Sequence, residues 1–271
     1  MISITFLLQF QSSSSLQEKK YYDFVTKSEI LDLSTSGNYQ CPDWIDYPIS
    51  VSKAAGGFLG KNPVICGGHP VDDQCYSISS NAVDFFGVLE TARYGAASVT
   101  INSSVLWITG GGIRIASSEF VLNNGSILKG PDLPTENSGH AMVNINNTVT
   151  MVIGGNLFFT GSSSRTYLYN HVSKNWSSGP DLIQARYDHA AGIVTDEVTL
   201  EKILLVAGGD TAGVSSTGAL SSTEILLDNA WSSGKHRFQI LCIWAMGIVS
   251  LGFMISFLNH PKYVIFWCKN Q

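Results

Sequence analysis

Short apolar runs alternate with small and polar residues along most of the chain, and four of these runs end in adjacent glycines. Brief runs of β-branched and apolar residues between turn residues are typical of strands that are buried on both faces. The first glycines, at 67, 111, 154 and 208, lie 44, 43 and 54 residues apart. The pattern therefore predicts an array of similar four-stranded units. The pairs are Gly67-Gly68, Gly111-Gly112, Gly154-Gly155 and Gly208-Gly209.

Other signals recur around each pair in a fixed order. A segment of small residues before each apolar run is expected to begin a first strand, and the run itself forms the second. These segments begin at Lys53, Gly95, His140 and His189. Third strands are expected at 75–78, 119–122, 166–169 and 224–227, with a partial copy at 29–32. A shorter fourth strand carries an aromatic anchor, clearest at Trp176 and Trp231.

The unit from Gly154 to Trp176 resembles a kelch repeat, in which a Gly-Gly strand is followed by a strand with Tyr and by Trp seven residues later. Tyr169 and Trp176 fit these positions. The other units depart from the pattern, because Tyr76 has no matching Trp and Phe120 stands near the position of the expected Tyr. The resemblance covers 28–232 and implies an all-β, kelch-type β-propeller with about four complete four-stranded blades plus a half blade.

The glycines are expected to adopt positive φ where the second strand leaves each blade, so that adjacent blades approach closely. Ordinary turn glycines in a β-sandwich are the alternative, but a sandwich would not repeat the flanking signals in the same order. Propellers of the kelch type usually close with six or seven blades. We therefore expect a fragment of a longer ring, with a five-bladed ring and a ring completed by another chain as alternatives.

The two ends of the chain differ from the repeats. Residues 238–258 contain no charged side chain over 21 positions, which predicts a transmembrane helix followed by a short tail at 259–271. The alternative is a tail from a shortened or misjoined transcript. Positive residues flank the helix on both sides and set no orientation. Residues 1–27 begin with an apolar stretch that suits a secretory signal, although no positively charged segment precedes it.

Two features favour an oxidising, extracellular compartment. Asn-X-Ser/Thr acceptors for N-glycosylation occur at Asn102, Asn124, Asn146 and Asn175, all near expected turns. Cys66 ends one expected strand and Cys75 begins the next, so a hairpin would bring them close enough for a disulfide. The alternative for these cysteines is that they are small buried side chains in a reducing cell.

Composition and motifs point to no chemistry. The formal net charge of −5 gives no basic footprint for nucleic acid. The six histidines show no metal-ligand spacing, no Cys-X-X-Cys is present, and no phosphate-binding motif occurs. No residue set matches the copper site of galactose oxidase. We expect no catalytic residues, metal or cofactor, and we expect Arg93-Tyr94 and Arg186-Tyr187 to brace neighbouring blades.

The function expected of such a scaffold is binding of a protein or peptide through its loops. The longest loops are Leu157–Ser164 and Thr211–Ser222. The membrane is the second expected partner, through 238–258, and no small-molecule ligand is expected. The alternatives are a galactose-oxidase-like or glycan-active enzyme on the same scaffold, and an intracellular kelch adaptor for a ubiquitin ligase.

Overall fold

The computed structural model describes residues 5–7, 29–31, 48–49, 51–70, 73–79, 82–195, 202–211 and 218–234. Every regular element among these residues is a β-strand. None of the described segments forms an apolar helix of membrane-crossing length. The helix predicted at 238–258, the tail 259–271 and most of the N-terminal segment 1–27 lie outside the described residues.

Sixteen of the strands form four antiparallel sheets, and each sheet contains four strands from one continuous part of the chain. Blade 1 consists of β3 (Ala55–Leu59), β4 (Asn62–Cys66), β5 (Gln74–Ile78) and β6 (Val83–Val88). Blade 2 consists of β7 (Ala97–Ile101), β8 (Val105–Thr109), β9 (Ser118–Leu122) and β10 (Ile127–Lys129). Blade 3 consists of β11 (Ala141–Asn146), β12 (Val149–Ile153), β15 (Thr166–Asn170) and β16 (Asn175–Ser178). Blade 4 consists of β17 (Ala190–Thr195), β18 (Lys202–Ala207), β19 (Thr223–Leu227) and β20 (Ala230–Ser233).

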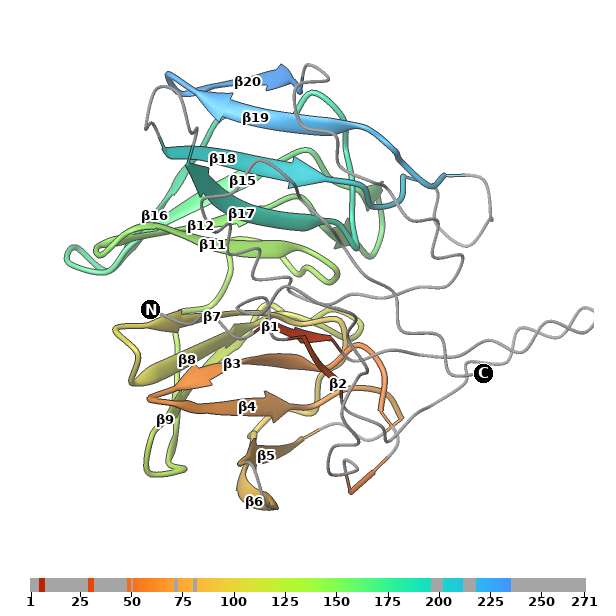
Figure 1. Ribbon diagram of the computed structural model, residues 1–271. Coiled ribbons are helices and arrows are strands. Elements are labelled where there is room, and N and C mark those ends of the chain that lie inside the picture. The colour runs from red at the N-terminus through yellow and green to blue at the C-terminus, as the bar shows by residue number, and fades with distance from the viewer. Residues whose placement is uncertain are drawn as a thin grey trace, which may run out of the picture.

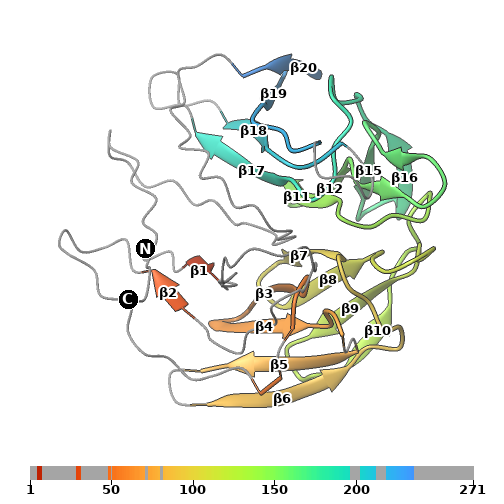
Figure 2. The same ribbon diagram turned by 90° about the vertical axis from the view of Figure 1, so that its right-hand side faces the viewer.

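The four blades are arranged radially, with their first strands β3, β7, β11 and β17 innermost and adjacent in that order (Figure 2). The prediction of four complete four-stranded units is therefore confirmed. The half blade predicted to begin near 29–32 is not seen as a third and a fourth strand among the described residues: β2 (Glu29–Leu31) belongs to a two-stranded sheet and lies on the open side between blades 4 and 1 (Figure 2). Its antiparallel partner is β1 (Thr5–Leu7), inside the stretch that suited a secretory signal.

The direction of the strands gives the propeller two different ends (Figure 1). Turns join the first strand to the second and the third to the fourth, and because strands alternate in direction, these turns all lie at one end. We call this end the hairpin face, and it is on the left in Figure 1. The second-to-third connections and the connections between blades lie at the opposite end, which we call the loop face.

The second strand of each blade packs on both of its faces, as its apolar run predicts. In β8, Leu106 and Ile108 join a buried cluster shared with blade 1, whereas Trp107 points the other way into a cluster shared with blade 3. Successive side chains of a strand point to opposite faces, so a central strand between two neighbouring blades must be apolar at every position. The hydrophobic core is thus a series of layers between blades.

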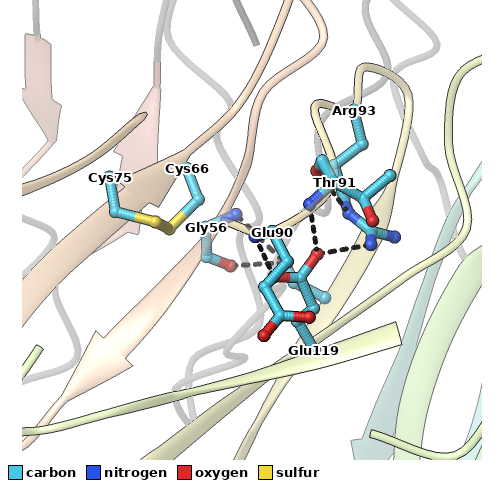
Figure 3. Close-up of a disulfide and its surroundings, with 8 residues drawn as sticks. Gly56, Cys66, Cys75, Glu90, Thr91, Arg93 and Glu119 are labelled. Carbon is cyan, nitrogen blue, oxygen red and sulfur yellow. Dashed lines mark hydrogen bonds and ion pairs between the residues drawn. A yellow bond between two sulfur atoms is a disulfide. The ribbon is translucent and has the colours of Figure 1, made fainter. Parts of the chain in front are cut away.

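The predicted pairing of Cys66 and Cys75 is confirmed. The two residues are partners in the β4–β5 ladder, their Cα atoms are 4.0 Å apart, and their sulfur atoms form a disulfide (Figure 3). Both side chains are buried in the layer between blades 1 and 2. The disulfide joins two neighbouring strands of one blade.

Candidate functional site

The glycine pairs lie on the loop face, where the second strand of each blade ends. All eight predicted glycines have positive φ, between 58° and 110°. The strand register corrects one pair, because β8 ends at Thr109 and the pair that follows it directly is Gly110-Gly111, not Gly111-Gly112. Gly110 has φ 59° and Gly111 has φ 88°. Three consecutive glycines hid this register in the sequence, and the corrected steps between pairs are 43, 44 and 54 residues.

A chain of backbone hydrogen bonds runs around the axis on the loop face. The N–H groups of Gly95, Gly139 and Asp188 donate in turn to the carbonyl oxygens of Lys53, Gly95 and Gly139, over 2.8, 2.8 and 2.7 Å. These four residues all have positive φ, from 52° to 63°, and occupy the same place in successive blades. The sequence-based grouping of Lys53 and Gly95 with His140 and His189 was therefore wrong by one position.

An ion pair joins the first and last members of this chain. Lys53 Nζ lies 3.5 Å from Asp188 Oδ2, so the charges link blade 1 to blade 4 across the axis. Burial raises the pKa of Asp188, and the nearby Lys53 opposes this shift. Burial, together with the negative charges of Asp210 and Asp188, raises the pKa of Tyr187 to about 12. At neutral pH the phenol of Tyr187 therefore keeps its proton.

Two buried arginines hold the connections between blades, as the sequence predicted for bracing residues. Arg93 donates to the carbonyl oxygens of Gly110 and Ser117 at 2.8 and 2.9 Å. It also donates to Glu119 Oε1 at 2.6 Å, as Figure 3 shows. The Glu119 carboxylate also accepts hydrogen bonds from the backbone N–H groups of Glu90 and Thr91. This network holds the connection that leaves blade 1 against β9 of blade 2.

The same network is repeated in blade 4. Arg186 donates to Gly208 O at 2.6 Å and to Glu224 Oε1 at 2.8 Å, and the backbone N–H groups of Ile183 and Gln184 donate to the Glu224 carboxylate. The sequence alone did not identify Glu119 and Glu224 as the partners of these arginines. In the sequence, each Arg-Tyr pair is followed by a Glu near the beginning of the third strand that comes next, and this recurrence could have identified the two glutamates.

The two repeat histidines lie beside these arginines and are neutral. Burial, followed by the charge of Arg93, lowers the pKa of His140 to about 3. Burial, the charge of Arg186 and the proximity of His140 lower the pKa of His189 to about 3. His140 Nε2 lies 2.7 Å from Thr109 Oγ1, whereas neither ring nitrogen of His189 has a hydrogen-bond partner among the described residues.

Acidification is expected to destabilise the fold through these histidines. Each histidine has an ordinary unfolded-state pKa near 6.5 and a folded-state pKa of about 3, so its contribution is present above pH 6.5 and is lost as the pH falls toward 3. Between about pH 7.5 and about pH 5.5 the loss is roughly one to two kcal/mol for each histidine. Urea unfolding at both pH values measures it. His140→Gln should show a smaller acid-induced loss than the parent, and an equal loss would contradict the assignment.

The repeat aromatics Tyr169, Trp176 and Trp231 have structural contacts. Tyr169 and Trp176 are partners in the β15–β16 ladder, and their ring centroids are 4.9 Å apart. The indole of Trp176 donates to Asp132 O, and the indole of Trp231 donates to Pro180 O, each at 2.8 Å. Both acceptors follow the last strand of the preceding blade. Trp176 and Trp231 therefore tie the outer strands β16 and β20 to the segment that leaves the preceding blade.

An exposed aromatic patch lies on the loop face, in the connections that follow β8 and β12. We define the aromatic patch as Ile113, Arg114, Phe158 and Phe159. Ile113, Phe158 and Phe159 are 61%, 52% and 75% exposed. The Arg114 guanidinium lies 4.8 Å from the centre of one phenyl ring and 4.6 Å from the other. The patch thus combines apolar rings with a cation.

A short two-stranded hairpin orders the backbone that carries Phe158 and Phe159. The loop predicted at Leu157–Ser164 contains a hairpin formed by β13 (Asn156–Leu157) and β14 (Gly161–Ser162). Ser162 Oγ also donates to Thr211 O in the second long loop, at 3.1 Å. Part of that second loop, 212–217, lies outside the described residues. The rings of Phe158 and Phe159 therefore project from a hydrogen-bonded turn.

The hairpin face carries a polar hollow of about 270 Å³ between blades 2, 3 and 4. Asn102, Asn144, Asn146, His171 and Lys202 contribute polar side chains to its wall. Burial lowers the pKa of His171, whose Nε2 lies 2.7 Å from Thr150 Oγ1. The predicted acceptors Asn102 and Asn146 thus border this hollow.

No group of three or more His, Cys, Asp or Glu side chains among the described residues is arranged to hold a metal ion. The two buried carboxylates described above are each committed to an arginine. The features brought together on the loop face are therefore the glycine pairs, the Lys53–Asp188 ion pair and the aromatic patch.

No protein-family model matches the chain, and no curated protein matches its sequence. Among solved structures, that of YjhT is similar, with a TM-score of 0.63, 13% sequence identity and coverage of 78% of each chain. Such a low identity carries information about the fold alone. Together with the four radial sheets, this similarity supports one conclusion: the chain is a β-propeller.

Proposed function

We propose that this protein is a non-catalytic docking module that binds another protein or a peptide through the loop face of its propeller. The aromatic patch carries the proposal. Other exposed large apolar side chains, such as Phe85, Leu128 and Val172, belong to separate elements, whereas those of the patch gather on one face around an arginine. Clustered aromatic residues and arginine are typical of the centres of protein interfaces.

The chemistry of the patch indicates what the partner presents. Arg114 forms no ion pair with another residue in the part of the chain that the structure describes. Its guanidinium has planar donors that match a carboxylate, while the rings of Phe158 and Phe159 suit an apolar side chain. The partner therefore presents Asp or Glu beside an aliphatic or aromatic residue.

The scaffold suits this role because its loops are held before binding. The buried Arg93–Glu119 and Arg186–Glu224 pairs and the positive-φ glycines fix the connections on the loop face. A surface that is already ordered loses little conformational entropy when a partner binds. The order of Gly-Gly strand, Tyr169 and Trp176 in blade 3 supports a propeller of the kelch type.

The proposal includes an extracellular location, with the propeller tethered by a helix at 238–258. The Cys66–Cys75 disulfide supports an oxidising compartment, and the uncharged 21-residue stretch supports the tether. Labelling the chain at each end and testing access of antibodies to intact cells checks both parts. Staining that requires permeabilisation at both ends would contradict the extracellular location.

Panning a random phage-displayed peptide library against the detergent-purified full chain tests the docking function. We expect the selected peptides to carry an acidic residue beside an apolar one. Their affinity should fall at least tenfold for Phe159→Ala and for Arg114→Ala, which is the scale of an interface hot spot. Val172→Ala is the matched control, because Val172 is also 75% exposed but lies on the hairpin face.

Two outcomes would contradict the proposal. Peptides that bind the parent, Phe159→Ala and Arg114→Ala equally well would place docking elsewhere on the molecule. Stoichiometric copper together with oxidase turnover in the purified protein would contradict the non-catalytic role and favour the enzymatic alternative.

A further inference from the structure

All four N-glycosylation acceptors lie on the same end of the propeller. Asn102 is in the β7–β8 turn, Asn124 is in the β9–β10 turn, Asn146 ends β11 before the turn to β12, and Asn175 begins β16 after the turn from β15. Each of these turns joins a first strand to a second or a third strand to a fourth. Alternation of strand direction therefore puts all four residues on the hairpin face, at the left of Figure 1.

The side chains of these residues are suited to modification. All four are exposed. The Asn124 Oδ1 atom accepts a hydrogen bond from the backbone N–H of Ser126, and Asn146 Oδ1 accepts from the backbone N–H and the hydroxyl of Thr148. The Nδ2 atoms of the four acceptors donate to no other described residue. A glycan on Nδ2 would therefore remove no hydrogen bond of the described fold.

Two other asparagines give a direct contrast. Asn137 Nδ2 donates to Gly154 O, and Asn144 Nδ2 donates to Thr100 O, each at 2.8 Å. Neither residue has the Ser or Thr two positions later that an acceptor requires, because Gly139 and Asn146 stand there. The sequence contains no fifth acceptor, so the described loop face carries none. The asparagines that have an acceptor motif are thus different residues from these two asparagines, whose Nδ2 atoms hold the fold together.

We propose that Asn102, Asn124, Asn146 and Asn175 carry N-linked glycans, and that these glycans cover the hairpin face and leave the loop face to the protein partner. The bond that forms joins Nδ2 to the anomeric carbon of an oligosaccharide. The bond that breaks joins that carbon to the diphosphate of a lipid-linked donor, and the amide proton leaves to solvent. The assignment of the glycan sites does not depend on the docking function, whereas the statement about which face the partner binds rests on that proposed function.

Glycans at these positions also cover the polar hollow. Asn102 and Asn146 contribute to its wall from neighbouring blades. Sugars attached there stand over the opening between them, so the hollow of the glycosylated protein is closed to large ligands. The hairpin face then has one role, which is to carry glycan, and binding is confined to the opposite end.

Site mapping tests the glycans independently of any partner. The full chain is expressed in a eukaryotic cell line and treated in ¹⁸O-water with the amidase that removes N-glycans and converts each occupied Asn to Asp. We expect the labelled conversion at all four acceptors, and each single Asn→Gln variant should lose one step in apparent mass. No conversion at any of the four, or conversion confined to one blade, would overturn the inference.

A glycan introduced on the loop face tests the orientation. Phe158→Asn creates an Asn-Phe-Thr acceptor inside the aromatic patch, because Thr160 follows two positions later. The matched control is Phe158→Asn combined with Thr160→Ala, which loses the same ring but has no acceptor. With the library-selected acidic peptides as the probe, the glycosylated variant should bind at least tenfold more weakly than the control. Equal binding would overturn the orientation.

Glycan mapping and peptide binding test the glycan inference and the docking function separately. Occupied acceptors combined with an absence of selected peptides would reject the docking function and leave the glycan sites intact. Peptide binding at the patch without any occupied acceptor would reject the glycan inference alone. Asn124→Gln should leave peptide affinity unchanged, since its glycan lies on the far end of the propeller.

Discussion

Glu119→Gln is expected to destabilise the protein by about 3–5 kcal/mol, the usual cost of leaving one partner of a buried ion pair uncompensated. The side chains of Arg93 and Glu119 are only 1% and 3% exposed, so the remaining guanidinium cannot recover hydration from solvent. The substitution also removes a charged acceptor from the backbone N–H groups of Glu90 and Thr91. The connection between blades 1 and 2 therefore loses its anchor.

Equilibrium urea unfolding, followed by tryptophan fluorescence, measures this effect. Asp132→Asn is the matched control, because the Lys129–Asp132 pair is exposed, with N···O 3.9 Å, and should contribute well under about 1 kcal/mol. Replacing both buried partners, as Arg93→Met with Glu119→Leu, should recover much of the loss by removing both charges. Equal effects of Glu119→Gln and Asp132→Asn would show that the buried pair is not a brace.

Gly111→Ala is expected to cost at least about 3 kcal/mol, because a left-handed backbone and a steric clash both oppose the added methyl group. Gly111 has φ 88°, which L side chains rarely adopt. A Cβ there would lie 2.9 Å from Ala96 Cβ, from Ala96 N and from Tyr94 O. Two of these three atoms belong to the backbone, so relief requires movement of the connection between blades.

Gly161→Ala separates the two contributions. Gly161 has a similar φ of 79°, but a Cβ there would meet no atom within 4 Å. Its cost should stay within about 1–2 kcal/mol, the penalty of the left-handed conformation alone. The difference between the two variants in urea unfolding reports the clash, and equal costs would mean that the connection at Tyr94 and Ala96 does not lie close against Gly111.

The second and third strands could be predicted from the sequence because their signals are local. The run Ile203–Val206 lies inside β18, and the segment Thr166–Tyr169 lies inside β15, since uninterrupted apolar runs and alternating aromatic residues reflect burial between neighbouring blades. The disulfide followed for the same reason, because Cys66 and Cys75 flank one turn. Such features need only the order of residues within a single blade.

The details that fix the loop face could not be predicted in this way. Choosing Gly110-Gly111 among three glycines requires the ladder partner of Thr109, and pairing Arg93 with Glu119 requires contacts 26 residues apart. The aromatic patch combines residues from two blades, so no single repeat contains it. Repeat position alone also misaligned His140 and His189 with Lys53 and Gly95.

The sequence by itself determined the repeat, the strand order within each blade, the disulfide and the acceptor motifs, because all of these depend on residues close together in one unit. The tertiary structure alone decided which residues meet across blades. It paired Lys53 with Asp188, placed Arg114 over Phe158 and Phe159, and put every acceptor on one end. The physical reason is that these contacts depend on the radial stacking of separate sheets and on strand direction, which local residue patterns do not encode.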